Sequence, residues 1–136
     1  MKKVIVPALV SAIAMIAVSI VLGYLFNFLF PSVKAEYENP ALFRPWDDPV
    51  MYLFFLQPFL LSGALAWGWD KTKGLFQVSA RRALNVALIY LVIATLPGML
   101  MSVSSFKISV LMTLTWTVSS FFQVWIGSCI IVRMNK

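Results

Sequence analysis

The sequence contains no histidine, and its single cysteine is Cys129. Histidine is the commonest general base and metal ligand, so its absence removes the usual groups for acid–base catalysis and for metal binding. One cysteine excludes an intrachain disulfide and every paired-cysteine redox or zinc motif. The sequence therefore predicts no metal site, no catalytic residue and no cofactor, and it favours a non-catalytic role over an enzyme.

Charged residues are also scarce. They make up 12% of the 136 residues, whereas hydrophobic residues make up 61%; a soluble domain has about 25% charged residues. Such a surplus of apolar side chains has to face lipid, so we expect residues 1–136 to form a single domain embedded in a lipid bilayer. The net charge of +6 does not indicate nucleic-acid binding, because the basic residues stand at the ends of apolar runs.

The apolar runs carry no acidic or basic side chain deep in their interiors. Proton- and ion-coupled transporters usually keep an ionisable group near the middle of the membrane. The sequence thus weighs against ion-coupled transport.

Four apolar runs are long enough to cross a bilayer as helices, which takes about 20 residues. They predict an all-α integral membrane protein, a four-transmembrane-helix bundle with helices at about 4–30, 49–69, 83–103 and 108–132. The start, Met1-Lys2-Lys3, resembles a signal peptide, but the following run exceeds the about 7–15 apolar residues of such a segment. We therefore expect an uncleaved first helix.

The second run shows the clearest boundaries. Asp48 can cap a helix whose first residue is Pro49, because proline lacks only an N–H that would be unpaired there. At the other end, Trp67 and Trp69 precede Lys71 and Lys73. Aromatic rings followed by lysines are typical of a membrane–water interface.

Lysines and arginines predict the orientation of the bundle. With both termini in the cytoplasm, the inner side holds eight of the 11 basic residues and the outer side holds Lys34, Arg44 and Lys107. Short cytoplasmic loops carry such an excess of basic residues. The sequence thus predicts cytoplasmic termini in a bacterial inner (plasma) membrane, with an outer loop at 31–48 and an inner loop at 70–82.

The outer loop contains Pro31, Pro40 and Pro45. Proline restricts its own backbone and disfavours a helical conformation in the residue before it. We therefore expect an extended, ordered connection rather than a helix.

Small residues recur at helical spacing in the first and fourth helices. Such residues allow membrane helices to approach closely, so they predict two helix-packing faces: Ala8, Ala12, Ser19 and Gly23 in the first helix, and Ser120 and Gly127 in the fourth.

A second set of polar residues is expected in the outer half of the bundle. Gln57-Pro58 and Pro97-Gly98 are potential helix breaks, and breaks in membrane helices tend to line cavities. The candidate ligand-binding residues are Asn27, Gln57, Thr95, Thr113 and Thr117. The same residues also fit a simpler interpretation, in which they form hydrogen bonds between helices.

Two functions therefore remain open. The first is a small non-catalytic membrane protein that packs with itself as a homo-oligomer, or with a larger membrane complex. The alternative is a carrier of a small molecule or lipid, with its pocket in the outer half of the bundle. A carrier needs a continuous polar cavity that reaches water, whereas a packing subunit needs a dry core.

Overall fold

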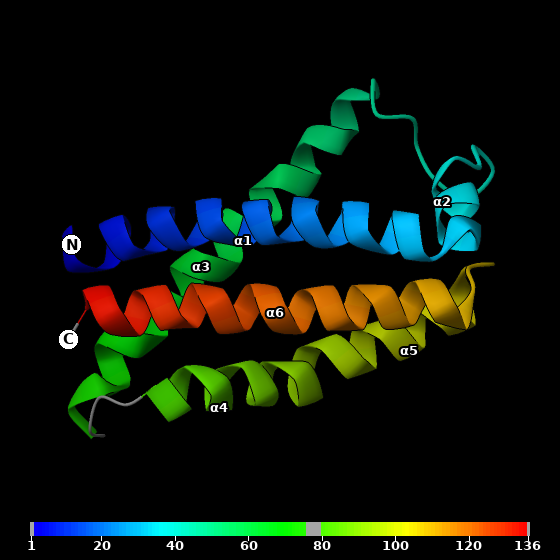
Figure 1. The fold of residues 1–136 in the computed structure, drawn as a ribbon. Coiled ribbons are helices and arrows are strands. Elements are labelled where there is room, and N and C mark those ends of the chain that lie inside the picture. Colours follow the sequence, from blue (N-terminus) through cyan, green and yellow to red (C-terminus); the bar gives the residue numbers. More distant parts are fainter. Residues whose placement is uncertain (1, 76–79, 136) are drawn as a thin grey trace.

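The computed structural model describes residues 2–75 and 80–135, and within these ranges the regular structure is entirely helical (Figure 1). In chain order the elements are α1 (Lys2–Leu29), α2 (Pro31–Tyr37), η1 (Pro49–Met51), α3 (Tyr52–Thr72), η2 (Lys73–Leu75), α4 (Ala80–Tyr90), η3 (Leu91–Thr95), α5 (Leu96–Ser105) and α6 (Val110–Met134).

Four helical segments are long and apolar enough to cross a membrane. They are Lys3–Leu29, Pro49–Thr72, Arg81–Ser105 and Val110–Met134. This confirms the all-helical class and the four apolar helices that the sequence predicts. Residues 76–79 of the expected 70–82 connection lie outside the described residues.

Helix α6 is the centre of the arrangement. It packs against α1 on one side and α4 on the other, and it also contacts α3 and α5. Figure 1 shows both chain ends at one end of the molecule, which we call the termini end, and α2 with the start of α6 at the opposite end, which we call the α2 end. Successive spans therefore run in opposite directions.

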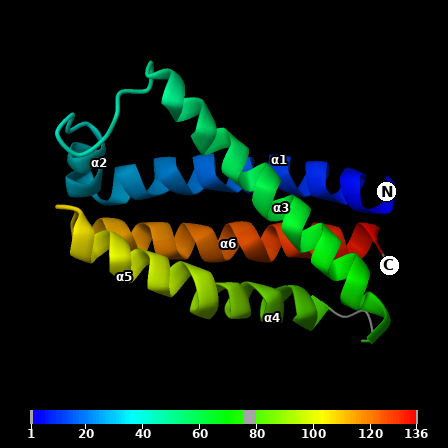
Figure 2. The ribbon, with the colours of Figure 1, turned by 180° about the vertical axis from the view of Figure 1, so that it is seen from behind.

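Helix α3 crosses the other helices obliquely (Figure 2). Toward the termini end it packs on α1 and α6. Its Ala66 and Trp69 form a hydrophobic core cluster there with Ile131 and Val132 of α6. This cluster anchors α3 to the bundle at one end.

The other half of α3 leaves the bundle (Figures 1 and 2). Within residues 52–60, all of which the structure describes, Pro58 alone is buried. The helix runs through Pro58 without interruption. The divergence therefore leaves about two turns of an apolar helix largely exposed, with Trp46 of the outer loop against Phe54.

The third span accommodates its proline with a π-helical stretch, η3, between α4 and α5. The Leu96 N–H donates to the carbonyl of Leu91, five residues earlier. Pro97 follows and cannot donate to the carbonyl four residues before it. Widening the helix just ahead of the proline lets the helical course continue into α5.

The outer loop differs from the sequence prediction, because Pro31–Tyr37 forms helix α2 rather than an extended segment. Pro31 occupies the first turn, where the absence of its N–H costs nothing. Val33 of α2 is fully buried. The burial of this side chain and the contacts of α2 with α6 described below outweigh the tendency of a proline-containing segment to stay extended.

Asp48 caps the second span as the sequence predicts. Its Oδ1 accepts a hydrogen bond from the Val50 N–H at 2.9 Å, and its Oδ2 pairs with Arg44 at 2.9 Å. The bond from Val50, and then the one from Arg44, hold the pKa of Asp48 below its usual value because both favour the carboxylate.

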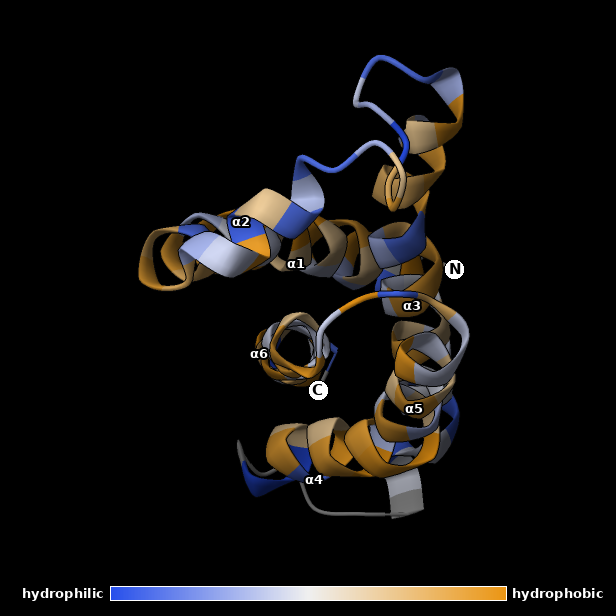
Figure 3. Cartoon of the chain, turned by 90° about the vertical axis from the view of Figure 1, so that its right-hand side faces the viewer, coloured by the Kyte–Doolittle hydropathy of each residue, from blue (hydrophilic) through white to orange (hydrophobic). Residues whose placement is uncertain are grey.

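Most of the apolar surface remains uncovered by the chain itself. In the most apolar stretch of each span, between 11% and 33% of the residues are buried. Orange, hydrophobic ribbon accordingly dominates all four spans in Figure 3. A surface of this kind needs lipid or further protein around it.

Candidate functional site

The polar residues expected to line an outer pocket are not gathered around one cavity. Gln57 is exposed on α3 and makes no hydrogen bond to the residues that the structure describes. On α6, the Thr113 hydroxyl donates to the carbonyl of Ser109 at 2.9 Å, and the Thr117 hydroxyl donates to the carbonyl of Thr113 at 2.8 Å. These threonines therefore satisfy their hydroxyls within their own helix.

Thr95 is one of the two remaining candidates, and it forms a bond between helices. Its hydroxyl lies 3.1 Å from that of Ser120, which joins η3 to α6. Asn27 is half-buried on α1, and its Oδ1 is buried with no partner among the described residues. The two grooves described below do not include Asn27, Gln57 or Thr95 in their linings.

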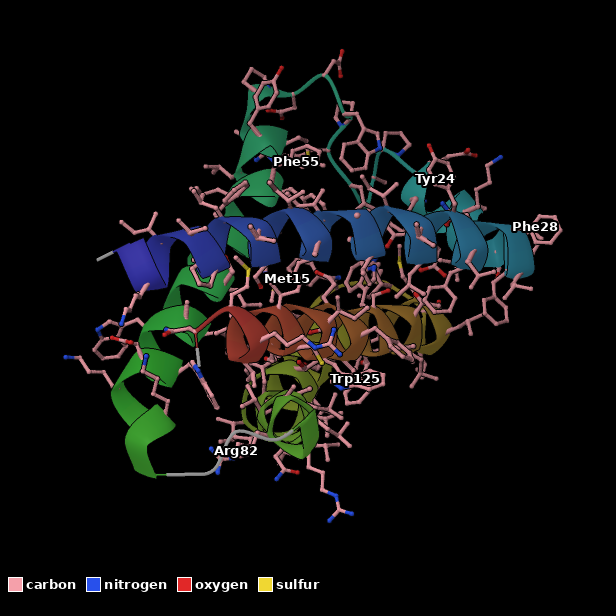
Figure 4. The ribbon with its side chains drawn as sticks, turned by 60° about the vertical axis from the view of Figure 1, so that its left-hand side comes forward. Met15, Tyr24, Phe28, Phe55, Arg82 and Trp125 are labelled. Carbon is pink, nitrogen blue, oxygen red and sulfur yellow. The ribbon has the colours of Figure 1, made fainter. Side chains whose placement is uncertain are left out.

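The closest approach between helices occurs at Gly127. A Cβ built there would collide with the Cε of Met15 and lie 2.6 Å from the Oγ of Ser11. Figure 4 shows Met15 between α1 and α6. Only a residue without a side chain permits this contact.

Gly23 differs from Gly127 in its surroundings. A Cβ at Gly23 would meet no described atom within 4 Å. The close approach expected at Gly23 is therefore absent within the chain. Of the other small residues in the expected face of α1, Ala12 is fully buried, whereas Ala8 and Ser19 are half-buried.

The buried face of α1 is rotated relative to the expected one. Its fully buried side chains are Ser11, Ala12 and Met15. Met15 is long and flexible, and such a side chain fills the space left by a glycine on the facing helix. At Gly127 of α6, α1 thus places the long side chain of Met15 beside the small side chain of Ser11.

A polar cluster fastens α3 to α6 at the termini end. The Trp69 Nε1–H donates to the backbone carbonyl of Asn135 at 2.8 Å, and this bond is buried. Lys73 donates to the Asn135 side chain at 2.6 Å and pairs with Asp70 at 3.1 Å. The guanidinium of Arg82 lies 5.9 Å from the centre of the Trp69 ring, within the range of a cation–π contact.

A second polar cluster fastens α2 to the start of α6. The Glu36 Oε2 accepts from the Ser109 N–H at 2.8 Å. A carboxylate is favourable there because the N–H groups of a helix start carry partial positive charge. The Trp116 indole N–H donates to the Tyr37 hydroxyl, and the two rings form an aromatic group with Phe43.

The described residues also line two shallow grooves. One, of about 290 Å³, lies between α3, α4 and α6 at the termini end, with Gly68, Val86 and Ser128 in its lining. The other, of about 380 Å³, lies at the α2 end beside Phe43 and Trp116. The first is almost wholly apolar, and neither brings together the charged groups that would hold a polar substrate.

The exposed side of α3 carries a regular row of residues. Its members stand alternately four and three residues apart, which is the spacing of a coiled-coil seam; we call them the α3 seam, and they are Leu53, Gln57, Leu60, Ala64 and Trp67. All are exposed, and the three large apolar members are each more than 60% exposed. The seam lies on a different side of α3 from the buried Ser62, Ala66 and Trp69.

Sequence reasoning missed the residues of both polar clusters. Asn135 is one of three polar residues beyond the last apolar run, and Glu36 is one of several acidic residues in the loop. Neither has a local pattern that identifies its partner. Trp69 could be placed at an interface from the sequence, but its hydrogen bond to a carbonyl 66 residues away could not.

Comparisons with protein-family models, with curated proteins and with solved structures each found no match to this chain.

Proposed function

We propose that this chain is a small, non-catalytic integral membrane protein that acts by packing with further copies of itself or within a larger membrane complex. The observation that carries the proposal is the exposed half of α3, where Pro58 alone is buried within the fully described stretch 52–60. Membrane helices associate through van der Waals packing and interhelical hydrogen bonds. This half of α3 offers a largely exposed apolar surface and an amide, that of Gln57, without a hydrogen bond to the described residues.

Composition supports a role without catalysis. The sequence offers no histidine, and Cys129 is its only thiol. General acid–base and nucleophilic catalysis need such groups held close together. The two polar clusters contain ionisable groups, but their bonds join one helix to another and account for the described contacts of Asp70, Lys73 and Glu36.

A carrier for a small molecule or lipid has less support. It requires the polar groups of the outer half to converge on one ligand, with a bridging water or ligand reaching two to four partners. Gln57 is instead exposed, Thr95 bonds to Ser120, and Thr113 bonds within α6. Among the candidate ligand-binding residues, Asn27 alone keeps a buried oxygen without a described partner.

The proposed location is the inner (plasma) membrane of a bacterium, with both termini in the cytoplasm. Within the described residues, the termini end carries seven basic residues and the α2 end carries Lys34, Arg44 and Lys107. Such an excess marks the cytoplasmic side when the loops are short. The α2 end would then face outward.

Native mass spectrometry tests the proposed association. The protein would be released from the membrane in a mild detergent and also in lipid nanodiscs formed directly from the membrane. We expect a mass equal to several copies of the 15.3 kDa chain, or to the chain with additional protein subunits. A single chain without any protein partner in both preparations would overturn the proposal.

A further inference from the structure

The amide of Gln57 indicates which partner this chain packs with. The partner inferred from it rests on the proposed function. Gln57 lies eight residues after Pro49, so it is about 12 Å along the helix from the start of the span, and it is about 15 Å before Trp67. This position is within the hydrocarbon layer, which is about 30 Å thick. The Gln57 side chain is exposed and makes no hydrogen bond to the described residues.

Lipid tails cannot satisfy this amide. Transfer of an amide from water into a purely apolar medium without a hydrogen bond is strongly unfavourable. A glutamine carboxamide has two N–H donors and one carbonyl acceptor, so its partner has to supply both an acceptor and a donor at the same depth. The neighbours of Gln57 on the seam, Leu53 and Leu60, can supply neither.

A second copy of the same chain meets these requirements. Two copies inserted in the same direction place equal residues at equal depth, so Gln57 meets Gln57 across a two-fold axis along the membrane normal. One amide then donates to the other, and the interface is complementary to itself. The half of α3 that carries Gln57 stands away from α1 and α6 (Figure 2), so a neighbouring helix can reach it.

The spacing of the seam fits the same partner. Alternating steps of four and three residues allow two helices to pack in parallel with a left-handed crossing of about 20°. Leu53 and Leu60 pack on either side of the amide pair, and the small Ala64 permits close contact below it. A single polar residue in an apolar seam also fixes the register of the two helices.

We propose that the α3 seam is a symmetric interface between two copies of this chain, with a hydrogen-bonded pair of Gln57 amides in its apolar centre. The seam extends from Leu53 to Trp67, which is about 21 Å of helix and most of the hydrocarbon thickness. The rest of the fold needs no change, because the seam is exposed in the single chain.

Disulfide cross-linking tests the geometry in the intact membrane. Cys129 is first replaced by serine, and single cysteines are introduced as Leu60→Cys on the seam and Leu56→Cys off it. Both leucines are exposed, at 66% and 48%, so the two sites are matched in access from lipid. Oxidation should yield a covalent dimer with Leu60→Cys and little with Leu56→Cys.

Substitution of the amide tests its contribution. Gln57→Leu should weaken dimerisation by about threefold to thirtyfold, since interhelical hydrogen bonds in membranes contribute about 0.6–2 kcal/mol. Gln57→Asn keeps a carboxamide and should restore part of the loss. Association is measured by Förster transfer between labelled copies at decreasing protein-to-lipid ratios, and circular dichroism confirms that each variant keeps its helices.

The outcomes separate this inference from the function on which it rests. If the wild-type protein assembles but Leu60→Cys gives no cross-link and Gln57→Leu associates as the wild type does, the seam interface is wrong and association through another face stands. If Leu60→Cys cross-links, Leu56→Cys does not, and Gln57→Leu associates more weakly than the wild type, the inference holds. A wild-type protein that stays monomeric at all ratios overturns the seam interface, whereas the proposed function is overturned only if native mass spectrometry also finds no other protein partner.

Discussion

Gly127→Leu should destabilise the fold by about 3 kcal/mol, at the upper end of the cost of overpacking a core. Even a Cβ at this position collides with Met15 and comes within 2.6 Å of the Ser11 hydroxyl. A leucine adds three further carbon atoms, so Met15 has to leave its position between the helices or α1 and α6 have to separate. Unfolding in mixed detergent micelles, followed by circular dichroism, measures the loss.

Gly23→Leu is the matched control. Both glycines lie inside long helices, so the gain in helix propensity on replacing glycine is the same at both positions. A Cβ at Gly23 has open space, and this variant should unfold as the wild type does. If Gly127→Leu does not fold, Gly127→Ala with and without Met15→Ala provides a graded test. Equal stability of the two leucine variants would show that α1 and α6 do not meet at Gly127.

Trp69→Ala should cost about 3–5 kcal/mol, as truncation of a large buried aromatic side chain usually does. Trp69 is 8% exposed, and its ring packs against Ala66, Ile131 and Val132. The substitution also removes the buried hydrogen bond to the carbonyl of Asn135. The junction between α3 and α6 should therefore loosen, which the same unfolding measurement detects.

Two further variants divide this loss into its parts. Trp69→Phe keeps most of the apolar ring and leaves the Asn135 carbonyl unpaired, so it should cost about 1–3 kcal/mol. Trp46 is 67% exposed, and Trp46→Ala should change the unfolding free energy by about 0.5 kcal/mol or less. A Trp69→Ala protein as stable as Trp46→Ala would contradict the described role of the termini-end cluster.

Local chemistry explains which parts of the fold could be predicted. The apolar runs specify four long helices, because a bilayer leaves few other ways to satisfy the backbone. Asp48 followed by Pro49 specifies a helix start, since the capping bond joins residues only two apart. Neither prediction requires knowledge of a neighbouring helix.

Features that depend on a neighbour could not be predicted in the same way. The face that α1 turns toward α6 depends on rotation about the helix axis, and a shift of one residue turns a helix by about 100°. The small-residue pattern indicated both Gly23 and Gly127, but only Gly127 has a close neighbour within the chain, and the pattern did not indicate that this neighbour is Met15. Likewise, Thr95 has a partner only because η3 lies beside Ser120 on α6.

Gln57 shows most clearly what could not be predicted from the sequence alone. In the sequence it precedes Pro58 within an apolar run, a pattern that fits a pocket as well as the simpler interpretation of a packing bond. In the fold its exposure depends on the departure of half of α3 from the bundle. No local pattern specifies the angle at which two helices diverge.

Cysteine accessibility in intact cells tests the membrane arrangement, on which every proposal above depends. In a Cys129→Ser background, Ser32→Cys lies in α2 at one end and Gly74→Cys lies in η2 after the second span; both residues are exposed. A membrane-impermeant maleimide should label Ser32→Cys on intact cells and Gly74→Cys only after permeabilisation. Labelling of Gly74→Cys on intact cells, or protection of Ser32→Cys there, would contradict a four-span protein with cytoplasmic termini.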